Sequence, residues 1–216
     1  MISIQSTDIF GWEAAIRGMR NPMNSWDKSD SDFIDVFDDI IDLRSYSLRS
    51  ANIGENDLGL MKKLASNGSV HAKYRRMIIV YADITAPLYW WKEFDTYKVG
   101  TVANSCSTMH KISEKEFTLE DFSHEHLNGE TTHILEKVIW SLNISRDCFR
   151  SDTSNKNYWW QLIQLLPSSY NQKRTVLLNY EVLSNIYKHR KNHKLDEWLD
   201  FCKWIEELPY SEIITC

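Results

Sequence analysis

The sequence contains no run of apolar residues near the ~20 that a membrane-spanning helix needs. Its first residues also lack the basic stretch and apolar core of a secretory signal, so we expect neither a membrane anchor nor export. Positive charge is not in excess: 25 Lys and Arg stand against 30 Asp and Glu, a formal net charge of -5. Because an acidic chain gains no counterion release on a phosphate backbone, we expect no nucleic-acid polymer as partner. A single nucleotide would need only a local positive site.

Cysteine is scarce, and no two cysteines form a C-x-x-C pair: they are Cys106, Cys148, Cys202 and Cys216. A chain of 216 residues can bury a core without disulfides. We therefore predict free thiols, a reducing cytoplasmic location and a single domain over residues 1–216.

Patterns that could bind a metal are weak in this sequence. The triplet His124-Glu125-His126 lacks the i, i+4 spacing that places two His ligands on one helix face. Many Asp residues fall between Trp26 and Asp42, but a metal needs carboxylates that converge on one point. For that segment we favour a solvated loop and helix face, and we predict no metal site.

Apolar periodicity and turn residues give a coarse secondary structure. Strands are predicted over residues 2–5, 78–81 and 174–178, and a polar loop over 100–108. Thr118 begins a capping box and a short helix. Longer helices are predicted over residues 9–19, 55–67, 88–98, 130–142, 158–166, 180–189 and 194–208.

The stretch from His71 to His110 combines a predicted strand, Pro87, an aromatic helix and a loop rich in hydroxyl and amide groups. Such a loop offers several hydrogen-bond donors without a fixed charge, which suits one wall of a ligand pocket. Cys106 in this loop could act as a nucleophile, with His110 four residues on as the nearest base.

This stretch resembles the central region of the flavin-dependent thymidylate synthases, whose signature is R-H-R-x-x-S-x-N-E-x-S-x-R-Y. His71 falls on a family His, Ala86-Pro87 on an Ala-Pro, and residues 96–109 on the signature without a gap. Many signature residues differ. The substitutions include Glu93 for a Gln just upstream, Thr96, Tyr97 and Lys98 for R-H-R, Asn104 for the Glu, Cys106 for a Ser and Thr108 for the last Arg.

A second part of the resemblance lies near the C-terminus, so that the whole spans roughly residues 65 to 200. Leu166-Pro167 and Tyr170 lead to Asn179, and Arg190 follows eleven residues later, with Asn185 between them. In the family these asparagines hydrogen-bond the flavin and the arginine contacts the uracil end of the substrate. Two further family arginines, one for substrate and one for flavin, fall on Ile163 and Glu181.

The resemblance implies an α/β (α+β) fold in which long helices flank a small mixed sheet, and a homotetramer with sites between subunits. It implies FAD as cofactor, NADPH and folate as co-substrates, and a uracil-type nucleotide such as dUMP as substrate. The cofactor residues would be His71, Tyr97, Lys98, Asn179 and Asn185. The substrate residues would be Glu93, Asn104, Ser105, Cys106, Thr108 and Arg190, with Arg190 also catalytic.

The missing arginines leave more than one function open. Each lost charge-assisted contact would weaken ligand binding by roughly 1.5–3 kcal/mol. Nearby cations could compensate for this loss, and the candidates are Lys73, Arg75, Arg76 and Lys92. One reading is a divergent flavoenzyme that methylates a uracil nucleotide reductively. Another is a catalytically inactive protein that holds or sequesters a different nucleotide, and a third is a scaffold without ligand.

Single residues also have structural alternatives. Arg190 could be an ordinary residue of a helix surface, and His71 could be structural. Asn179 and Asn185 could cap or bridge local backbone. The aromatic residues Tyr97 and Trp90-Trp91 could belong to the core rather than stack on a ligand.

Overall fold

The computed structural model describes residues 2–35 and 49–216. The chain divides into two compact units. Unit 1 comprises Met1–Gln5, Asp83–Lys98 and Ala103–Val176, and unit 2 comprises Ser6–Ala82, Val99–Val102 and Leu177–Cys216. That residues 1–216 act as a single domain stays a prediction.

The described residues form two sheets. The larger has four strands in the order β1 (Ser3–Phe10), β4 (Ile79–Pro87), β6 (Asn171–Asn179) and β5 (Val102–Ser105). Along β4 the side chains alternate, so that Val80, Ala82, Ile84 and Ala86 are buried, as a strand with one face on a core requires. The smaller sheet pairs β2 (Asp32–Asp35) antiparallel with β3 (Arg49–Asn52). The predicted α/β (α+β) class, a small sheet flanked by long helices, is confirmed.

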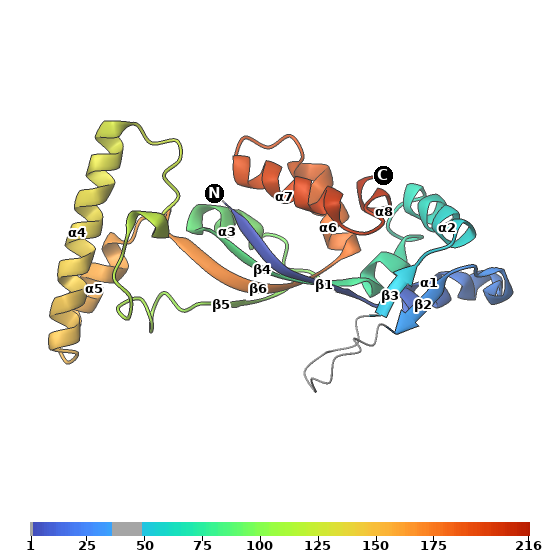
Figure 1. The fold of residues 1–216 in the computed structure, drawn as a ribbon, viewed down its shortest axis with the longest axis horizontal. Helices are drawn as coiled ribbons and strands as arrows, with labels where there is room; N and C mark the ends of the chain where they lie inside the picture. The colour runs from blue at the N-terminus through green and yellow to red at the C-terminus, as the bar shows by residue number, and fades with distance from the viewer. Residues whose placement is uncertain (1, 36–48) are drawn as a thin grey trace. The chain divides into compact units, whose positions relative to one another are not determined.

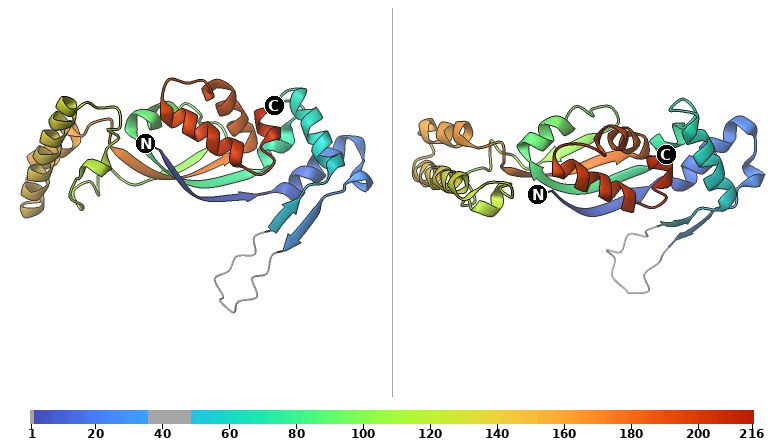
Figure 2. Two further views of the ribbon diagram at one scale, coloured as in Figure 1. Left: turned by 45° about the horizontal axis from the view of Figure 1, so that its top comes forward. Right: turned by 90° about the horizontal axis from the view of Figure 1, so that it is seen from above.

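Unit 1 contains the helices α3 (Leu88–Phe94), α4 (Gly129–Ser151) and α5 (Lys156–Leu165), and the 3-10 turn η4 (Leu119–Asp121). The helices α4 and α5 lie side by side (Figure 1 and Figure 2). Their apolar faces close over one core cluster, made of Ile112, Phe117, Phe122, Leu135, Ile139, Leu142 and Leu162. The capping box predicted at Thr118 is present, with Asp121 as its reciprocal partner.

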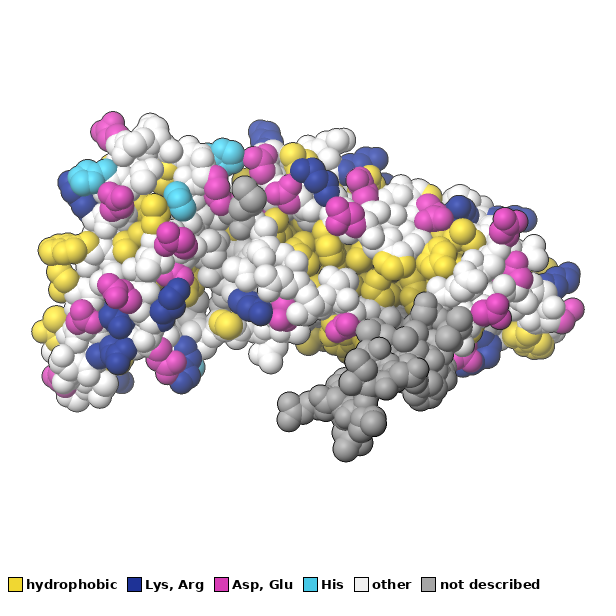
Figure 3. All heavy atoms as spheres, in the orientation of Figure 1, with side chains coloured by type: hydrophobic (Ala, Val, Ile, Leu, Met, Phe, Trp, Pro, Cys, Tyr) yellow, Lys and Arg dark blue, Asp and Glu magenta, His cyan; other side chains and the backbone are white. Residues whose placement is uncertain are grey.

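The outer surface of α4 is not uniformly polar. Figure 3 shows hydrophobic side chains between charged ones over this helix, and Ile134, Trp140 and Ile144 are its exposed apolar residues. The helix is longer than the predicted 130–142 and runs to Ser151. The apolar spacing predicted only the part whose buried residues end at Leu142.

Unit 2 contains α1 (Trp12–Arg20), α2 (Glu55–Ser66), α6 (Tyr180–Arg190), α7 (Asp196–Glu207) and α8 (Glu212–Thr215), with 3-10 turns η1 (Asn21–Met23), η2 (Trp26–Lys28) and η3 (Lys73–Met77). Large side chains fill the core where α6 packs against α7 and α8. The most buried are Tyr180, Leu183, Ile186, Trp198, Phe201 and Ile205.

A buried ion pair ties α1 to α2 in unit 2. The Arg20 Nε donates to Asp57 Oδ1 at 2.6 Å, and the Asp57 side chain is completely buried. The hydroxyls of Ser29 and Ser31 both donate to Asp57 Oδ2 at 2.7 Å. Burial raises the pKa of Asp57, but these hydrogen bonds and the Arg20 charge together hold that pKa below its ordinary value.

Two predicted boundaries near the N-terminus are wrong. The strand continues to Phe10, and α1 begins at Trp12 rather than at residue 9. The turn between them is made by Gly11, whose φ of 94° lies in the left-handed region and whose missing Cβ makes room for the Met77 carbonyl.

Two segments predicted as loops contain strands. Residues 102–105 form β5, because Cys106 and its neighbours bond to β6, which is remote in sequence. The acidic segment after Trp26 contains β2 at Asp32–Asp35, so the prediction of a loop and helix face is wrong there. Its residues 36–42 lie outside the described part of the chain.

Candidate functional site

Asn179 stands at the junction of β6 and α6 in unit 2. Its Oδ1 accepts a hydrogen bond from Val182 N at 3.0 Å, which makes it the N-cap of α6. Its Nδ2 donates to the Gly100 carbonyl at 3.4 Å. Gly100 has a φ of 80°, and a Cβ added there would lie 3.0 Å from Asn179 Nδ2. The predicted cofactor residue therefore joins the 99–102 segment to the start of α6.

Arg190 ends the same helix. Its guanidinium carbon lies 4.7 Å from the centroid of the Trp198 ring, and its Nη1 lies 2.9 Å from His193 Nε2. Asn185, one turn and a half earlier, is exposed, and its backbone carbonyl contacts His189 Nδ1 at 2.7 Å. The second part of the resemblance thus follows one helix, with Asn179 as its N-cap, Asn185 within it and Arg190 at its end.

Glu181, which the resemblance aligns with a flavin-contacting arginine, is paired within unit 2. Its Oε2 lies 3.8 Å from Arg75 Nη1, and both side chains are largely buried, at 21% and 6% exposure. The second terminal nitrogen of Arg75, Nη2, donates to Cys216 Sγ at 3.1 Å. Arg75, one of the candidate cations named above, is therefore held inside unit 2. The other three candidates, Lys73, Arg76 and Lys92, are exposed.

The predicted site residues of unit 1 lie on α3, on β5 and in the segments directly after them. Glu93 and Tyr97 are partly buried, and Lys98 is exposed. Asn104 and Ser105 are exposed on β5. The two remaining residues come next, exposed Cys106 and partly buried Thr108.

Hydrogen bonds to β6 fix the end of β5. The Cys106 N–H donates to the Lys173 carbonyl at 2.9 Å, and the Cys106 carbonyl accepts from Gln172 Nε2 at 2.7 Å. These contacts, one from the backbone and one from the Gln172 side chain, hold the segment in place, and Cys106 is exposed. Unit 1 therefore has an amide, a hydroxyl and a thiol on three consecutive residues at a fixed strand end.

Two residues beside this strand end, Arg174 and Gln172, were not predicted as site residues. Arg174 stacks on Trp91, with its guanidinium carbon 4.2 Å from the ring centroid, and pairs with Asp95 at 2.8 Å. Its Nε donates to Gln172 Oε1 at 3.0 Å, and Gln172 is 7% exposed. Strand alternation indicates only which face a residue lies on, so no pattern in the sequence could have marked this chain of contacts.

His71 lies apart from an element of regular structure, in the turn after α2. Its side chain is exposed, and its N–H donates to the Gly68 carbonyl at 3.0 Å. The role of His71 as a cofactor residue stays a prediction.

The part of the chain that the structure describes contains no cluster of three or more His, Cys, Asp or Glu side chains suited to a metal ion. Within the same residues, no helix is both long and apolar enough to cross a membrane.

The sequence matches no protein-family model and no curated protein. Solved structures do match. A flavin-dependent thymidylate synthase ThyX from Helicobacter pylori, described as complexed with FAD and dUMP, superposes with a TM-score of 0.66 at 15% identity, covering 98% of each chain. A second structure of ThyX from Helicobacter pylori, also with FAD and dUMP, gives a TM-score of 0.67 at 13% identity and covers 100% of both chains.

Proposed function

Because this chain has the fold of the flavin-dependent thymidylate synthases, we propose that it binds FAD and a uracil-type nucleotide such as dUMP and acts in reductive methylation. The observation that carries the proposal is the similarity over the full length of both chains to two structures that contain FAD and dUMP. At 13 and 15% identity the similarity concerns the fold, so the ligands and the reaction rest on the residues that this chain presents.

The hydrogen-bonding groups of the predicted site fit the polar edges of a uracil or flavin ring. Asn104, Ser105 and Lys98 are exposed in unit 1 and offer donors to ring carbonyls. In unit 2, Arg190 stacks on Trp198, which fixes the plane in which its N–H groups can point toward a substrate oxygen. In the proposal these residues bind and orient the nucleotide and the flavin ring. When FAD is bound, it supplies the hydride.

The pair of Glu181 and Arg75 does not fit the diphosphate of FAD. A carboxylate 3.8 Å from the guanidinium compensates its charge, and the burial of both side chains keeps the pair together. A diphosphate at this position would have to displace or repel the carboxylate. The phosphates would therefore need exposed cations instead, for which Lys98, Lys73 and Arg76 are candidates.

The same pair favours a second candidate function, a nucleotide-binding protein without methylation activity. If FAD cannot be held, no hydride can be supplied, but a single nucleotide could still use the amide and hydroxyl groups of unit 1. The substitutions in the signature, from Thr96 to Thr108, are consistent with this candidate.

An absorbance spectrum in the visible range, taken on purified protein with and without added FAD, separates the two candidates. Bound flavin that NADPH reduces, together with tritium release from labelled dUMP, would support the methylation proposal. A colourless protein that does not bind added FAD, but is stabilised by a nucleotide in a thermal-shift screen, would support the second candidate. A protein that responds to neither FAD nor any nucleotide would refute both.

Arg190→Ala provides the residue-level test of the same proposal. We expect it to abolish the nucleotide response, and Arg190→Lys to restore only part of it, because Lys lacks the planar fork. Arg150→Ala is a matched control, since Arg150 is an exposed helical arginine in unit 1 that lies outside the predicted site and donates to the Glu114 carbonyl at 2.9 Å. Equal responses of the Arg190 and Arg150 variants would contradict a ligand role for Arg190.

The quaternary and cellular parts of the proposal follow from the resemblance and from the free thiols. We propose a homotetramer with intersubunit sites, located in the cytoplasm, with folate as carbon donor. Light scattering coupled to size exclusion measures the assembly directly, and a monomer would contradict the intersubunit sites.

A further inference from the structure

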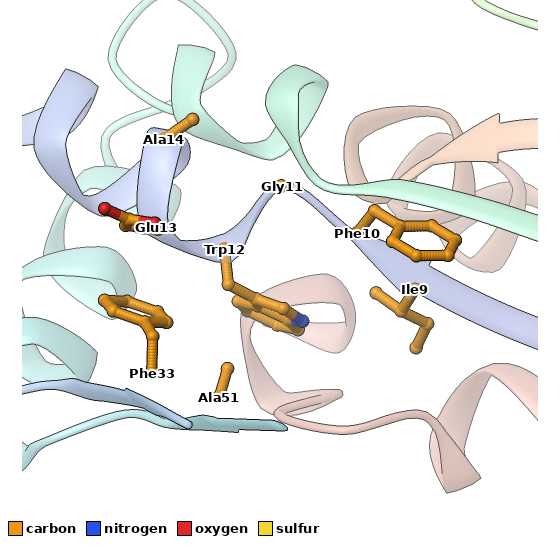
Figure 4. Close-up of a pocket in the computed structure, with 8 residues that line it drawn as sticks. All are labelled: Ile9, Phe10, Gly11, Trp12, Glu13, Ala14, Phe33 and Ala51. Atoms are coloured by element: carbon orange, nitrogen blue, oxygen red, sulfur yellow. The ribbon is translucent and has the colours of Figure 1, made fainter. Parts of the chain in front are cut away.

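Unit 2 contains a hollow beside β1 and α1 that includes none of the predicted site residues. One cavity of about 290 Å³ lies where Ile9, Trp12, Phe33 and Ala51 face one another (Figure 4). A second cavity of about 490 Å³ shares Ile9, Trp12 and Ala51 and extends to Tyr210. We call the two cavities together the Trp12 pocket.

The walls of the Trp12 pocket are aromatic and fixed in place. Trp12 is 6% exposed and makes edge contacts with Tyr180 and Tyr210, at centroid distances of 5.2 and 5.3 Å. The Tyr210 hydroxyl accepts from Ile53 N at 2.8 Å and donates to the Ala51 carbonyl at 3.1 Å. Such contacts set the position of the rings before any ligand arrives, which lowers the entropic cost of binding.

Trp204 forms a further wall of the second cavity, from the α7 side. Its indole Nε1 donates to Thr7 Oγ1 at 3.2 Å, and its ring packs against Phe201 at a centroid distance of 5.1 Å. The hydrogen bond fixes the indole against β1 and leaves the ring partly exposed. Trp12 and Trp204 thus offer two indoles from different elements to one hollow.

The backbone is strained at two places along this pocket. Tyr210 has a φ of 52°, and Ser6, next to the lining residue Thr7, has a φ of 51°. Residues other than glycine rarely adopt the left-handed region, because Cβ then crowds the carbonyl oxygen. Strain of this kind persists where the surrounding structure holds it, and it concentrates at ligand sites.

The charge of the pocket has one sign. Among the described lining residues three carry carboxylates and none carries a cation; the three are Asp8, Glu13 and Glu207. The charge of Glu13 is compensated by Arg17, whose Nη1 lies 3.4 Å from Glu13 Oε1. Asp8 and Glu207 are exposed and have no ion-pair partner among the residues that the structure describes. An anionic nucleotide would be repelled here, whereas a cation with an apolar body would be attracted both by the carboxylates and by the indole faces.

We propose that the Trp12 pocket binds an organic ammonium ion of the choline class. Its quaternary or tertiary ammonium group would lie against the faces of Trp12 and Trp204, within the field of Asp8 and Glu207. Its apolar substituents would contact Ile9 and Ala51. The volumes of the two cavities accommodate a small cation of this kind.

The test compares choline with its neutral isostere 3,3-dimethylbutan-1-ol, in which carbon replaces the charged nitrogen. The full-length protein carries 5-fluorotryptophan, and Trp12→Phe and Trp204→Phe assign the two fluorine resonances. We expect choline to shift these two resonances saturably, and the isostere to bind roughly 2- to 30-fold more weakly, the range that cation–π attraction supplies. Added salt should weaken choline binding, because Asp8 and Glu207 are exposed.

Variants test the role of charge without removing the aromatic walls. Glu207→Gln and Asp8→Asn should each reduce the affinity for choline several-fold and leave thermal unfolding unchanged. Glu116→Gln, an exposed substitution in unit 1 that changes the net charge equally, should have no effect. Equal binding of choline and the isostere, or the absence of any saturable shift in the unmodified protein, would overturn the proposal.

Discussion

Asn179 is the residue at which a structural role and a ligand-binding role can be separated by substitution. Its oxygen caps α6 at 3.0 Å from Val182 N, while its nitrogen donates to Gly100 at 3.4 Å. Asn179→Asp keeps the capping oxygen and loses the donor. Asn179→Ala loses both. The two variants therefore distinguish what the oxygen does from what the nitrogen does.

The expected magnitudes follow from these contacts. Losing an N-cap costs about 0.5–2 kcal/mol of the free energy of unfolding, whereas a hydrogen bond of 3.4 Å is near the long limit and adds little. We expect Asn179→Ala to cost about 1–2 kcal/mol and Asn179→Asp less than about 0.5 kcal/mol, since a carboxylate also caps and suits a helix N-terminus. Urea denaturation with an unchanged slope measures both values.

The affinity for FAD is the second quantity to measure on the same variants. If the Asn179 nitrogen binds flavin, Asn179→Asp should lower the affinity for FAD about tenfold while stability is kept. Asn128→Ala is the matched control, because Asn128 caps α4 in unit 1 at 3.0 Å from Thr131 N and lies outside the predicted site. Wild-type FAD binding by Asn179→Asp, with equal stability losses in the two alanine variants, would refute the reasoning and leave Asn179 as a cap alone.

Three further predictions concern stability and reactivity. Asp57→Asn should cost about 3–5 kcal/mol of unfolding free energy near neutral pH, because it leaves the buried Arg20 without its counterion. Since folding lowers the pKa of Asp57, the stabilisation is present above the ordinary value of 3.8 and is lost as the pH falls through the lower folded value, so wild type and variant should converge in acid denaturation. Gly100→Ala should cost more than Gly68→Ala in chemical denaturation: both have positive φ, but only Gly100 has neighbours within 4 Å of an added Cβ, and equal costs would contradict that contact. Burial raises the pKa of Cys202 to about 11, so a brief iodoacetamide pulse read by mass spectrometry should label it only after unfolding.

Local chemistry explains where the secondary structure could be predicted. The helix predicted over 55–67 is α2, because an acidic first turn and an Asn at its end act within a few residues of the boundary. β5 was missed because its pairing partner β6 lies about seventy residues away, and sequence-local patterns contain no information on that pairing. Gly11 was missed for a related reason, since its left-handed turn is required by the carbonyl of Met77.

The candidate site was predictable to the extent that it follows helix and strand ends. The predicted helix over 180–189 is α6, which carries Asn185 and ends at Arg190, and Asn179 is its N-cap at the end of β6. The partners of these residues were not predictable. Trp198 beneath Arg190 belongs to the next helix, and whether a side chain stacks on it depends on how the two helices pack. The ligand roles of all three residues stay predictions.

The contact between Glu181 and Arg75 also constrains how this chain could change by mutation. A single Glu181→Arg replacement, which would introduce the residue that the resemblance predicts at this position, would place a second guanidinium close to the Arg75 guanidinium in a largely buried site. Two like charges in such a place repel strongly, so the replacement would destabilise the fold before it could help any ligand. Arg75 would have to change first or at the same time. The two positions are therefore coupled, and the order of substitutions matters for any attempt to place an arginine at position 181.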